Sequence, residues 1–335
     1  MIINPNAKQR SYEAFCEPEL HKPLRLEPHI GLCNDNGTLY KFIEPNHRII
    51  DFIEPNLINA FDKANREAYD SPSSVEKYNN YLDWLFKSFK EDEMEFRKKL
   101  LSRLKLSKGM KVLVTGCGLG DDLPIILDEI GFEGEVHAQD ICKSMVVTAY
   151  GNIENQNIYF SISNATSLPY ISRYFDAVFH FGGINLFGDV KKAISEMERV
   201  CKIGGVVLFG DEGIAPHLKG SLYADIAINN IGLWATETPI NLIPYNASAI
   251  ELSYILGNCF YLISFTPTTG FPEMDIDVPH QGIRGGTART RYIGKQLSIT
   301  EQSKQKLFNE ANSKGISVHT LLDEIIAKQI PDDLL

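Results

Sequence analysis

The sequence has few of the features that mark a secreted or membrane-bound protein. Its six cysteines include no CxxC pair, which favours reduced, mostly buried thiols over a disulfide framework. No apolar run approaches the length of a membrane span, and residues 1–6 (MIINPN) lack the apolar centre of a signal peptide. These absences predict a soluble, cytoplasmic protein without a transmembrane segment.

Basic residues are also scarce relative to acidic ones. The chain has 33 Lys and Arg against 43 Asp and Glu, a net charge of −10 over 335 residues. Neutralising nucleic-acid phosphates takes clustered Lys and Arg, so this balance argues against a protein that coats a duplex. It leaves room for one local basic surface. We therefore expect a small-molecule partner, and nucleic acid is the less favoured one.

Glycine is missing from residues 61–107, where apolar side chains recur at helical spacing. This pattern predicts two helices, which we interpret as a helical lid. The preceding residues 1–60 are polar and rich in proline. Two short apolar patches, 39–43 and 48–53, predict a small hairpin or ribbon within this N-terminal ribbon-like extension.

From residue 111 onward, strand-like and helix-like segments alternate. The expected strands are 111–115, 135–139, 158–162, 175–181, 204–210 and 260–265, and the expected helices are 121–130, 143–150 and 188–201. Such alternation is typical of a parallel sheet with helices on both faces. We predict an α/β core over 108–268, in which residues 247–256 fit either a helix or a strand.

The last part of the chain, residues 269–335, has a pattern of its own. The expected elements are a strand at 292–299, a helix from Thr300 to Gly315 and a helix from Ser317 to Gln329. This order resembles the ribbon-helix-helix unit of dimeric DNA-binding repressors. Because the helices carry both signs of charge, we favour a docked helical hairpin or a homodimer contact over DNA binding.

The most informative segment is a glycine-dense turn after the first strand of the core. Gly116, Gly118 and Gly120 form this turn, and Asp140 lies twenty residues beyond the last of these glycines. This layout suits a nucleoside-bearing cofactor at the switch point of a parallel sheet. A dinucleotide fingerprint would have glycine in place of Asp121, and an acid there opposes a bound diphosphate. A cofactor with a sulfonium cation and no phosphate fits better.

Several further segments complete a pattern in chain order. They are Asp140 at the end of the second strand, NATSLPY at 164–170, FDAV at 175–178 and RVCKIGG at 199–205. With the glycine turn, these segments resemble class I S-adenosylmethionine-dependent methyltransferases, most closely the ubiquinone/menaquinone-biosynthesis-type, or type 11, branch. The resemblance covers about residues 65–215. It implies a Rossmann-like, seven-stranded, mostly parallel sheet with a reversed hairpin at its end, and S-adenosylmethionine as the cofactor.

The resemblance also implies roles for individual residues. Gly116, Cys117 and Gly118 would line the methionine part of the cofactor, Asp140 the ribose, and Ile141, Asn164 and Ala165 the adenine, while Tyr69 matches the YD segment that often opens the lid helices. Two positions depart from the family. Asn164 replaces an Asp but keeps an acceptor for the adenine amine. Thr115 replaces an acid that helps to hold the cofactor's amino group, and Asp121 or Asp122 is a candidate substitute.

Polar residues after the fourth and fifth strands are candidates for acceptor chemistry. They are Asp211, Glu212 and His217 as candidate catalytic groups and His180, Gly183 and Asn185 as candidate pocket residues. Ordinary loop polarity is the alternative for the first three. A histidine inside a strand, such as His180, is more often structural.

The expected reaction is methyl transfer from S-adenosylmethionine to a small-molecule acceptor, at O, N, C or S, by in-line displacement. A protein or RNA methyltransferase is one alternative, and acidic charge counts against RNA. Another is a cofactor-binding regulator whose C-terminal tail contacts DNA. Only Cys33 and His47 of the N-terminal extension could serve as zinc ligands where four are needed, so we expect no metal.

Overall fold

The computed structural model describes residues 12–43, 48–54, 58–71, 73–153, 157–271, 274–281, 285–289 and 299–329. The chain forms two compact units, residues 1–272 and 273–335. His47, one of the two zinc-ligand candidates, and residues 292–298 of the expected C-terminal strand lie outside the described residues.

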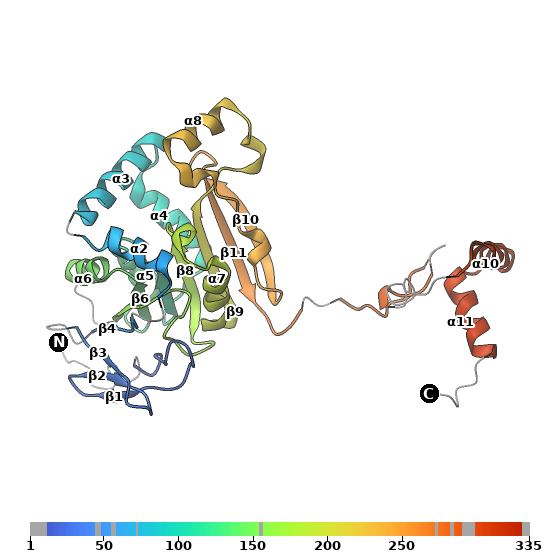
Figure 1. Ribbon diagram of the computed structural model, residues 1–335, viewed down its shortest axis with the longest axis horizontal. Helices are drawn as coiled ribbons and strands as arrows, with labels where there is room; N and C mark the ends of the chain where they lie inside the picture. Colours follow the sequence, from blue (N-terminus) through green and yellow to red (C-terminus); the bar gives the residue numbers. More distant parts are fainter. Residues whose placement is uncertain are drawn as a thin grey trace. The chain divides into compact units, whose positions relative to one another are not determined.

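An eight-stranded sheet forms the centre of the first unit (Figure 1). In spatial order its strands are β10 (Ala247–Ile255), β11 (Phe260–Pro267), β9 (Cys201–Glu212), β8 (Phe175–Phe181), β5 (Lys111–Thr115), β6 (Glu135–Asp140), β7 (Ile158–Ile162) and β4 (Ile49–Asp51). Strands from β9 to β4 pair in parallel, and β11 runs antiparallel to both β9 and β10. The Rossmann-like α/β expectation is confirmed. The eighth strand is β4, which the N-terminal extension contributes.

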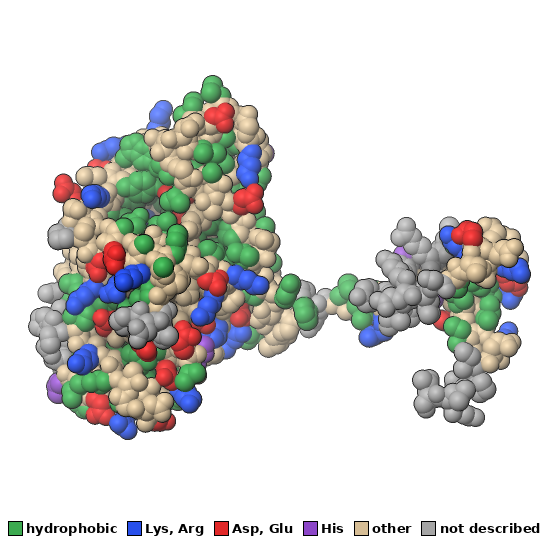
Figure 2. Space-filling model, viewed as in Figure 1, with side chains coloured by type: hydrophobic (Ala, Val, Ile, Leu, Met, Phe, Trp, Pro, Cys, Tyr) green, Lys and Arg blue, Asp and Glu red, His purple; other side chains and the backbone are tan. Residues whose placement is uncertain are grey.

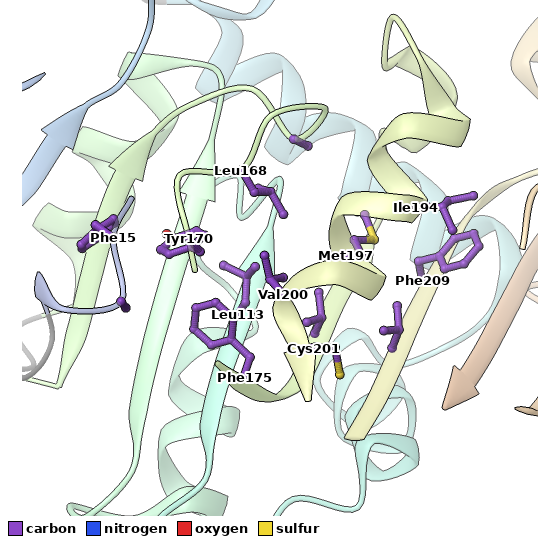
Figure 3. Close-up of a cluster of buried hydrophobic side chains, with 14 of the residues drawn as sticks. Phe15, Leu113, Leu168, Tyr170, Phe175, Ile194, Met197, Val200, Cys201 and Phe209 are labelled. Atoms are coloured by element: carbon purple, nitrogen blue, oxygen red, sulfur yellow. The ribbon is translucent and has the colours of Figure 1, made fainter. Parts of the chain in front are cut away.

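Apolar side chains cover both faces of the sheet and form a core on each. On one face, the core includes side chains of the helices α4 (Glu93–Leu101), α5 (Leu123–Ile130) and α6 (Lys143–Asn152). On the other face, it includes side chains of α7 (Val190–Val200). The N-terminal extension also contributes side chains to the core on the second face. There the ring centroids of Phe15 and Tyr170 are 5.0 Å apart. Figure 3 shows a row of side chains from Phe15 through Tyr170 and Phe175 to Met197 of α7.

The N-terminal extension differs from the expected hairpin. Its strands β1 (Arg25–Glu27), β2 (Gly31–Cys33) and β3 (Leu39–Lys41) form a separate antiparallel sheet. The expected pairing of 39–43 with 48–53 is reduced to one bridge, Phe42 to Ile50. The second patch instead becomes β4 and pairs with β7, because this buries Ile49 and Ile50 completely at the sheet edge.

Three helices precede the core where two were expected. They are α2 (Ala60–Tyr69), α3 (Ser74–Phe89) and α4, followed by the short helix η1 (Ser102–Leu104). The sequence pattern missed α2 because the residue that the helix buries is an acid, Asp62, and not an apolar side chain. Asn59 fixes its start by accepting a hydrogen bond from the Asp62 amide at 2.8 Å.

A second helical segment lies between β9 and β10. It comprises η3 (Pro216–Leu218), α8 (Leu222–Asn230), η4 (Gly232–Ala235) and η5 (Ile240–Leu242). Leu85 and Phe86 of α3 pack with Ala227 of α8 and Trp234 of η4 in one buried cluster. Hydrophobic side chains also gather on the surface around α3 and α8 (Figure 2).

The second unit contains a pair of helices, α10 (Glu301–Lys314) and α11 (Val318–Gln329). Thr300 caps α10, and Gly315 ends it in the left-handed conformation at φ 63°, so both expected helices are confirmed. Across the described parts of the chain, no helix has the length and apolarity needed to cross a membrane.

Candidate active site

A cavity of about 410 Å³ lies at the carboxyl ends of β5, β6, β8 and β9. The chain crosses here from β7 back to β8, so β5 and β8 flank the switch point at which α/β sheets bind ligands. Helices α2, α3 and α4 contribute the opposite wall. The volume is in the range of small-molecule sites.

The glycine turn and Asp140 form one end of this cavity. Gly116, Gly118 and Gly120 have φ values of 58°, 51° and 84°, which L side chains rarely adopt. The Asp140 carboxylate accepts hydrogen bonds from the Gly118 amide at 3.0 Å and the Cys142 amide at 2.9 Å. It therefore holds the loops after β5 and β6 together. Burial raises the pKa of Asp140, and these backbone donors oppose that rise.

All eight residues expected to bind the cofactor line this cavity. They are Tyr69, Gly116, Cys117, Gly118, Asp140, Ile141, Asn164 and Ala165. They come from α2, from the last residue of β6 and from the loops after β5, β6 and β7. We name this part of the cavity the cofactor end.

Asp62 of α2 is a residue of this end that the sequence pattern did not reveal. Its carboxylate accepts hydrogen bonds from the Asn164 side-chain amide at 2.9 Å and the Gly188 backbone amide at 2.7 Å. A third bond comes from the Asn59 amide group at 2.8 Å. Asp62 thus ties the lid helix α2 to the loops after β7 and β8. The Asn164 amide group is engaged in holding the lid, and its oxygen accepts from the Thr166 amide at 3.0 Å.

Thr115, the departure from the family pattern, faces away from the cavity. Its side chain is fully buried and donates to the Phe179 carbonyl at 3.4 Å. The candidate substitutes Asp121 and Asp122 do line the cavity, and both pair with Arg97 of α4, at 3.4 Å and 2.9 Å. Their negative charge is therefore partly compensated.

Asp211 and Glu212 lie at the other end of the cavity, where β9 terminates. Asp211 is fully buried and accepts from the backbone amides of Asn185 at 2.7 Å and Glu212 at 2.8 Å. Glu212 accepts from the Tyr81 hydroxyl of α3 at 2.7 Å. Burial, followed by the neighbouring Asp211 charge, raises the pKa of Glu212 to about 7.

Asn185 does not line the cavity, contrary to its expected pocket role. It lies in η2 (Ile184–Leu186), behind the two acids. Its backbone amide binds Asp211, and its side-chain amide donates to the Glu212 carbonyl at 2.7 Å. The Tyr261 hydroxyl fixes it in turn by donating to its side-chain oxygen at 3.0 Å. Asn185 therefore positions the acids.

Two histidine candidates have different environments. His180 lines the cavity next to Gly116, and burial lowers its pKa to about 4, so its ring is neutral at pH 7. Its Nδ1 lies 2.8 Å from the Thr115 carbonyl, while Nε2 has no partner among the described residues. His217 is exposed in η3 and does not line the cavity, because the chain turns away from the sheet after β9.

Apolar side chains form a wall of the same cavity. It consists of Leu82, Leu85, Phe86, Phe96, Phe181, Ile231, Leu233 and Phe260. We name this wall, with Tyr81, Asp211 and Glu212, the acceptor end. Phe260 of β11 lines this end of the cavity. Trp234 and Tyr261 are core residues, and Tyr245 is 83% exposed.

Comparison with known proteins bears on the same region. Residues 106–256 match a family described as "Methyltransferase domain". A demethylmenaquinone methyltransferase from Geobacillus sp. (strain WCH70) is 28% identical over 158 residues, which cover 46% of this chain and 62% of that protein. One from Anoxybacillus flavithermus (strain DSM 21510 / WK1) is 27% identical and covers similar shares, 46% and 61%. The chain thus matches about three fifths of these relatives.

A solved structure has the same fold. It is phosphoethanolamine N-methyltransferase 2 of Haemonchus contortus in complex with S-adenosyl-L-methionine, with a TM-score of 0.51 and 14% identity. The alignment covers 64% of this chain and 62% of that chain. Residues 106–256 are therefore a methyltransferase domain of class I, the S-adenosylmethionine-dependent type that the motifs resemble.

Proposed function

We propose that this protein transfers a methyl group from S-adenosylmethionine to a small-molecule acceptor. In this proposal the cofactor end holds S-adenosylmethionine, and the acceptor end holds the nucleophile. The observation that carries the proposal is one cavity that contains both a glycine loop tied to Asp140 and, beyond it, Glu212 with a pKa near 7.

The residues of the cofactor end fit S-adenosylmethionine. The backbone amides of Gly118, Ile141 and Cys142 hold the Asp140 carboxylate in place, and a carboxylate in this position can accept ribose hydroxyls. Gly118 has a φ of 51°, which L side chains rarely adopt, and a Cβ there would lie 3.6 Å from the Tyr78 hydroxyl. Six acidic residues line the cavity, which disfavours a diphosphate and suits a cationic cofactor.

When bound, S-adenosylmethionine supplies a methyl group on a positively charged sulfur. The protein aligns the acceptor with this group and excludes water, and such alignment contributes up to about 7–11 kcal/mol in favourable cases. The apolar wall and the lid helices supply the exclusion. Glu212 is placed to take a proton from an acceptor that arrives protonated, because its pKa lies near the working pH.

The test is to incubate the purified protein with methyl-labelled S-adenosylmethionine and a fractionated cell extract. We expect the label to move into a small-molecule fraction, with an Asp140→Ala variant as the inactive control. Label in a protein or RNA fraction would show that the acceptor is a protein or an RNA and not a small molecule. Cofactor binding without any transfer, together with salt-dependent binding of duplex DNA, would contradict the proposal in favour of a regulator.

A further inference from the structure

The acceptor end combines negative charge with a shortage of positive charge. Asp211 is fully buried and Glu212 is 9% exposed. No cation is among the groups that influence either carboxyl. Arg97 is the one Lys or Arg among the described residues that line the cavity, and it is already bound by Glu93, Asp121 and Asp122. An acceptor with a negative charge would therefore find no free partner here.

Aromatic rings line the same cavity as the two acids. Phe86, Phe96, Phe181 and Phe260 form a continuous row, with centroid separations of 5.3, 5.6 and 5.9 Å between neighbours. Tyr81 adds a ring whose hydroxyl is held by Glu212. The faces of aromatic rings attract cations, most strongly where water is excluded.

The cavity also contains an unpaired hydrogen-bond acceptor. The His180 Nε2 atom is buried and has no partner among the residues that the structure describes. Because Nδ1 faces the Thr115 carbonyl, Nε2 is the acceptor nitrogen of a neutral ring. Carboxylates, ring faces and an unpaired acceptor are together complementary to a positively charged N–H donor.

We infer that the acceptor is an amine with an apolar body, which enters the acceptor end as an ammonium ion. This inference rests on the proposed function and specifies its substrate class. The ammonium group lies against Asp211 and Glu212, and the apolar body lies against the row of phenylalanines. A phenolate, carboxylate or phosphate acceptor is excluded by the uncompensated charge.

The acids of β9 are well separated from the position expected to hold the ribose. Asp140 belongs to β6 and Glu212 to β9, and the two strands are separated by β5 and β8. Neighbouring strands lie about 4.8 Å apart, so these carboxylates are attached to strands about 14 Å apart.

The reaction balances with Glu212 as the base. The ammonium nitrogen loses one proton to the Glu212 carboxylate and regains a lone pair. That lone pair forms the bond to the methyl carbon while the carbon–sulfur bond breaks, and its electrons remain on the sulfur. The product is a methylated ammonium ion, and the proton on Glu212 passes to water.

The test uses calorimetry on the full-length protein saturated with S-adenosylhomocysteine, at about pH 8. Three probes share one apolar body: 2-phenylethylamine, which is protonated there, 2-phenylethanol and 3-phenylpropionate. We expect the amine to bind roughly tenfold more tightly than the alcohol, and the carboxylate to bind least. Glu212→Gln should abolish the preference for the amine. Asp121→Asn, which removes an equal charge at the cofactor end, should preserve it.

The outcomes separate the inference from the proposed function. Failure of S-adenosylhomocysteine to bind would contradict the proposed function itself. Binding of S-adenosylhomocysteine with no preference for the amine, or with a preference for the carboxylate, would overturn the inference alone. An amine preference that Asp121→Asn removes and Glu212→Gln keeps would also overturn it, because the cation would then lie at the cofactor end.

Discussion

The two ends of the cavity are built in different ways. At the cofactor end, backbone amides of loops after neighbouring strands converge on one carboxylate, Asp140. At the acceptor end, backbone amides also hold Asp211, but the wall of the cavity beside it and Glu212 consists of side chains from α3, α4, β8 and β11 and from the segment after α8. The cofactor end therefore depends on local loop geometry. The acceptor end depends on how distant segments pack, so changes in the lid should affect it more.

The largest expected effect is that of Glu212→Gln on turnover. Removing a general base lowers the rate by about 10²–10⁴-fold. Because Glu212 must be deprotonated, wild-type activity should rise with pH through about 7, and this rise should be absent in the variant. The charged or titratable groups that interact with it are Asp211, Tyr69, Tyr81 and Tyr261. The measurement is methyl transfer against pH, and an unchanged rise in the variant would exclude Glu212 as the base.

The next effect concerns the lid and Asp62. Asp62→Ala removes three hydrogen bonds to a carboxylate and leaves the Gly188 amide without its partner. We expect a loss of about 3 kcal/mol in the free energy of unfolding, and faster hydrogen exchange in residues 60–69. Urea denaturation and exchange measure both. Lys63→Ala, an exposed neighbour in the same helix, is the matched control and should change neither.

Glu212 also makes the stability of the fold depend on pH. Its pKa is raised to about 7 from 4.5, so folding binds a proton between these values, and stability falls as pH rises through this window. Glu212→Gln removes this loss of stability at high pH and keeps an acceptor for the Tyr81 hydroxyl. The variant should match the wild type at pH 4.5 and exceed it by at most about 3 kcal/mol above pH 7. A gain that is equal at both pH values would contradict this account.

The smallest effect is expected from Tyr81→Phe. The Tyr81 hydroxyl lowers the pKa of Glu212 by donating to its carboxylate. Without it, the rise of activity with pH should move upward by up to about one unit, the equivalent of one hydrogen bond. Cofactor affinity should stay the same. A fall in cofactor affinity with no movement of the profile would place Tyr81 at the cofactor end instead.

The difference between the two ends also decides how much the sequence predicted. The strands of the core, the glycine turn and Asp140 were predictable because local spacing encodes them. Asp62 was not, since an acid in the first turn of a helix normally faces solvent. The chain path after β9 carries His217 outward, and the register of η2 places Asn185 behind the acids. Such positions depend on tertiary packing, which spacing along the chain does not specify.

The most direct test of two separate ends is the affinity for S-adenosylhomocysteine of the Asp140→Ala and Glu212→Gln variants, measured side by side by calorimetry. We predict about 100-fold weaker binding for Asp140→Ala, which loses charge-assisted bonds to the ribose and the support of the Gly118 loop. Glu212→Gln should stay within about threefold of the wild type, because neutral groups of equal shape at the acceptor end leave the cofactor contacts intact. Unchanged affinity in Asp140→Ala, or an equal loss in both variants, would contradict the division of the cavity into a cofactor end and an acceptor end.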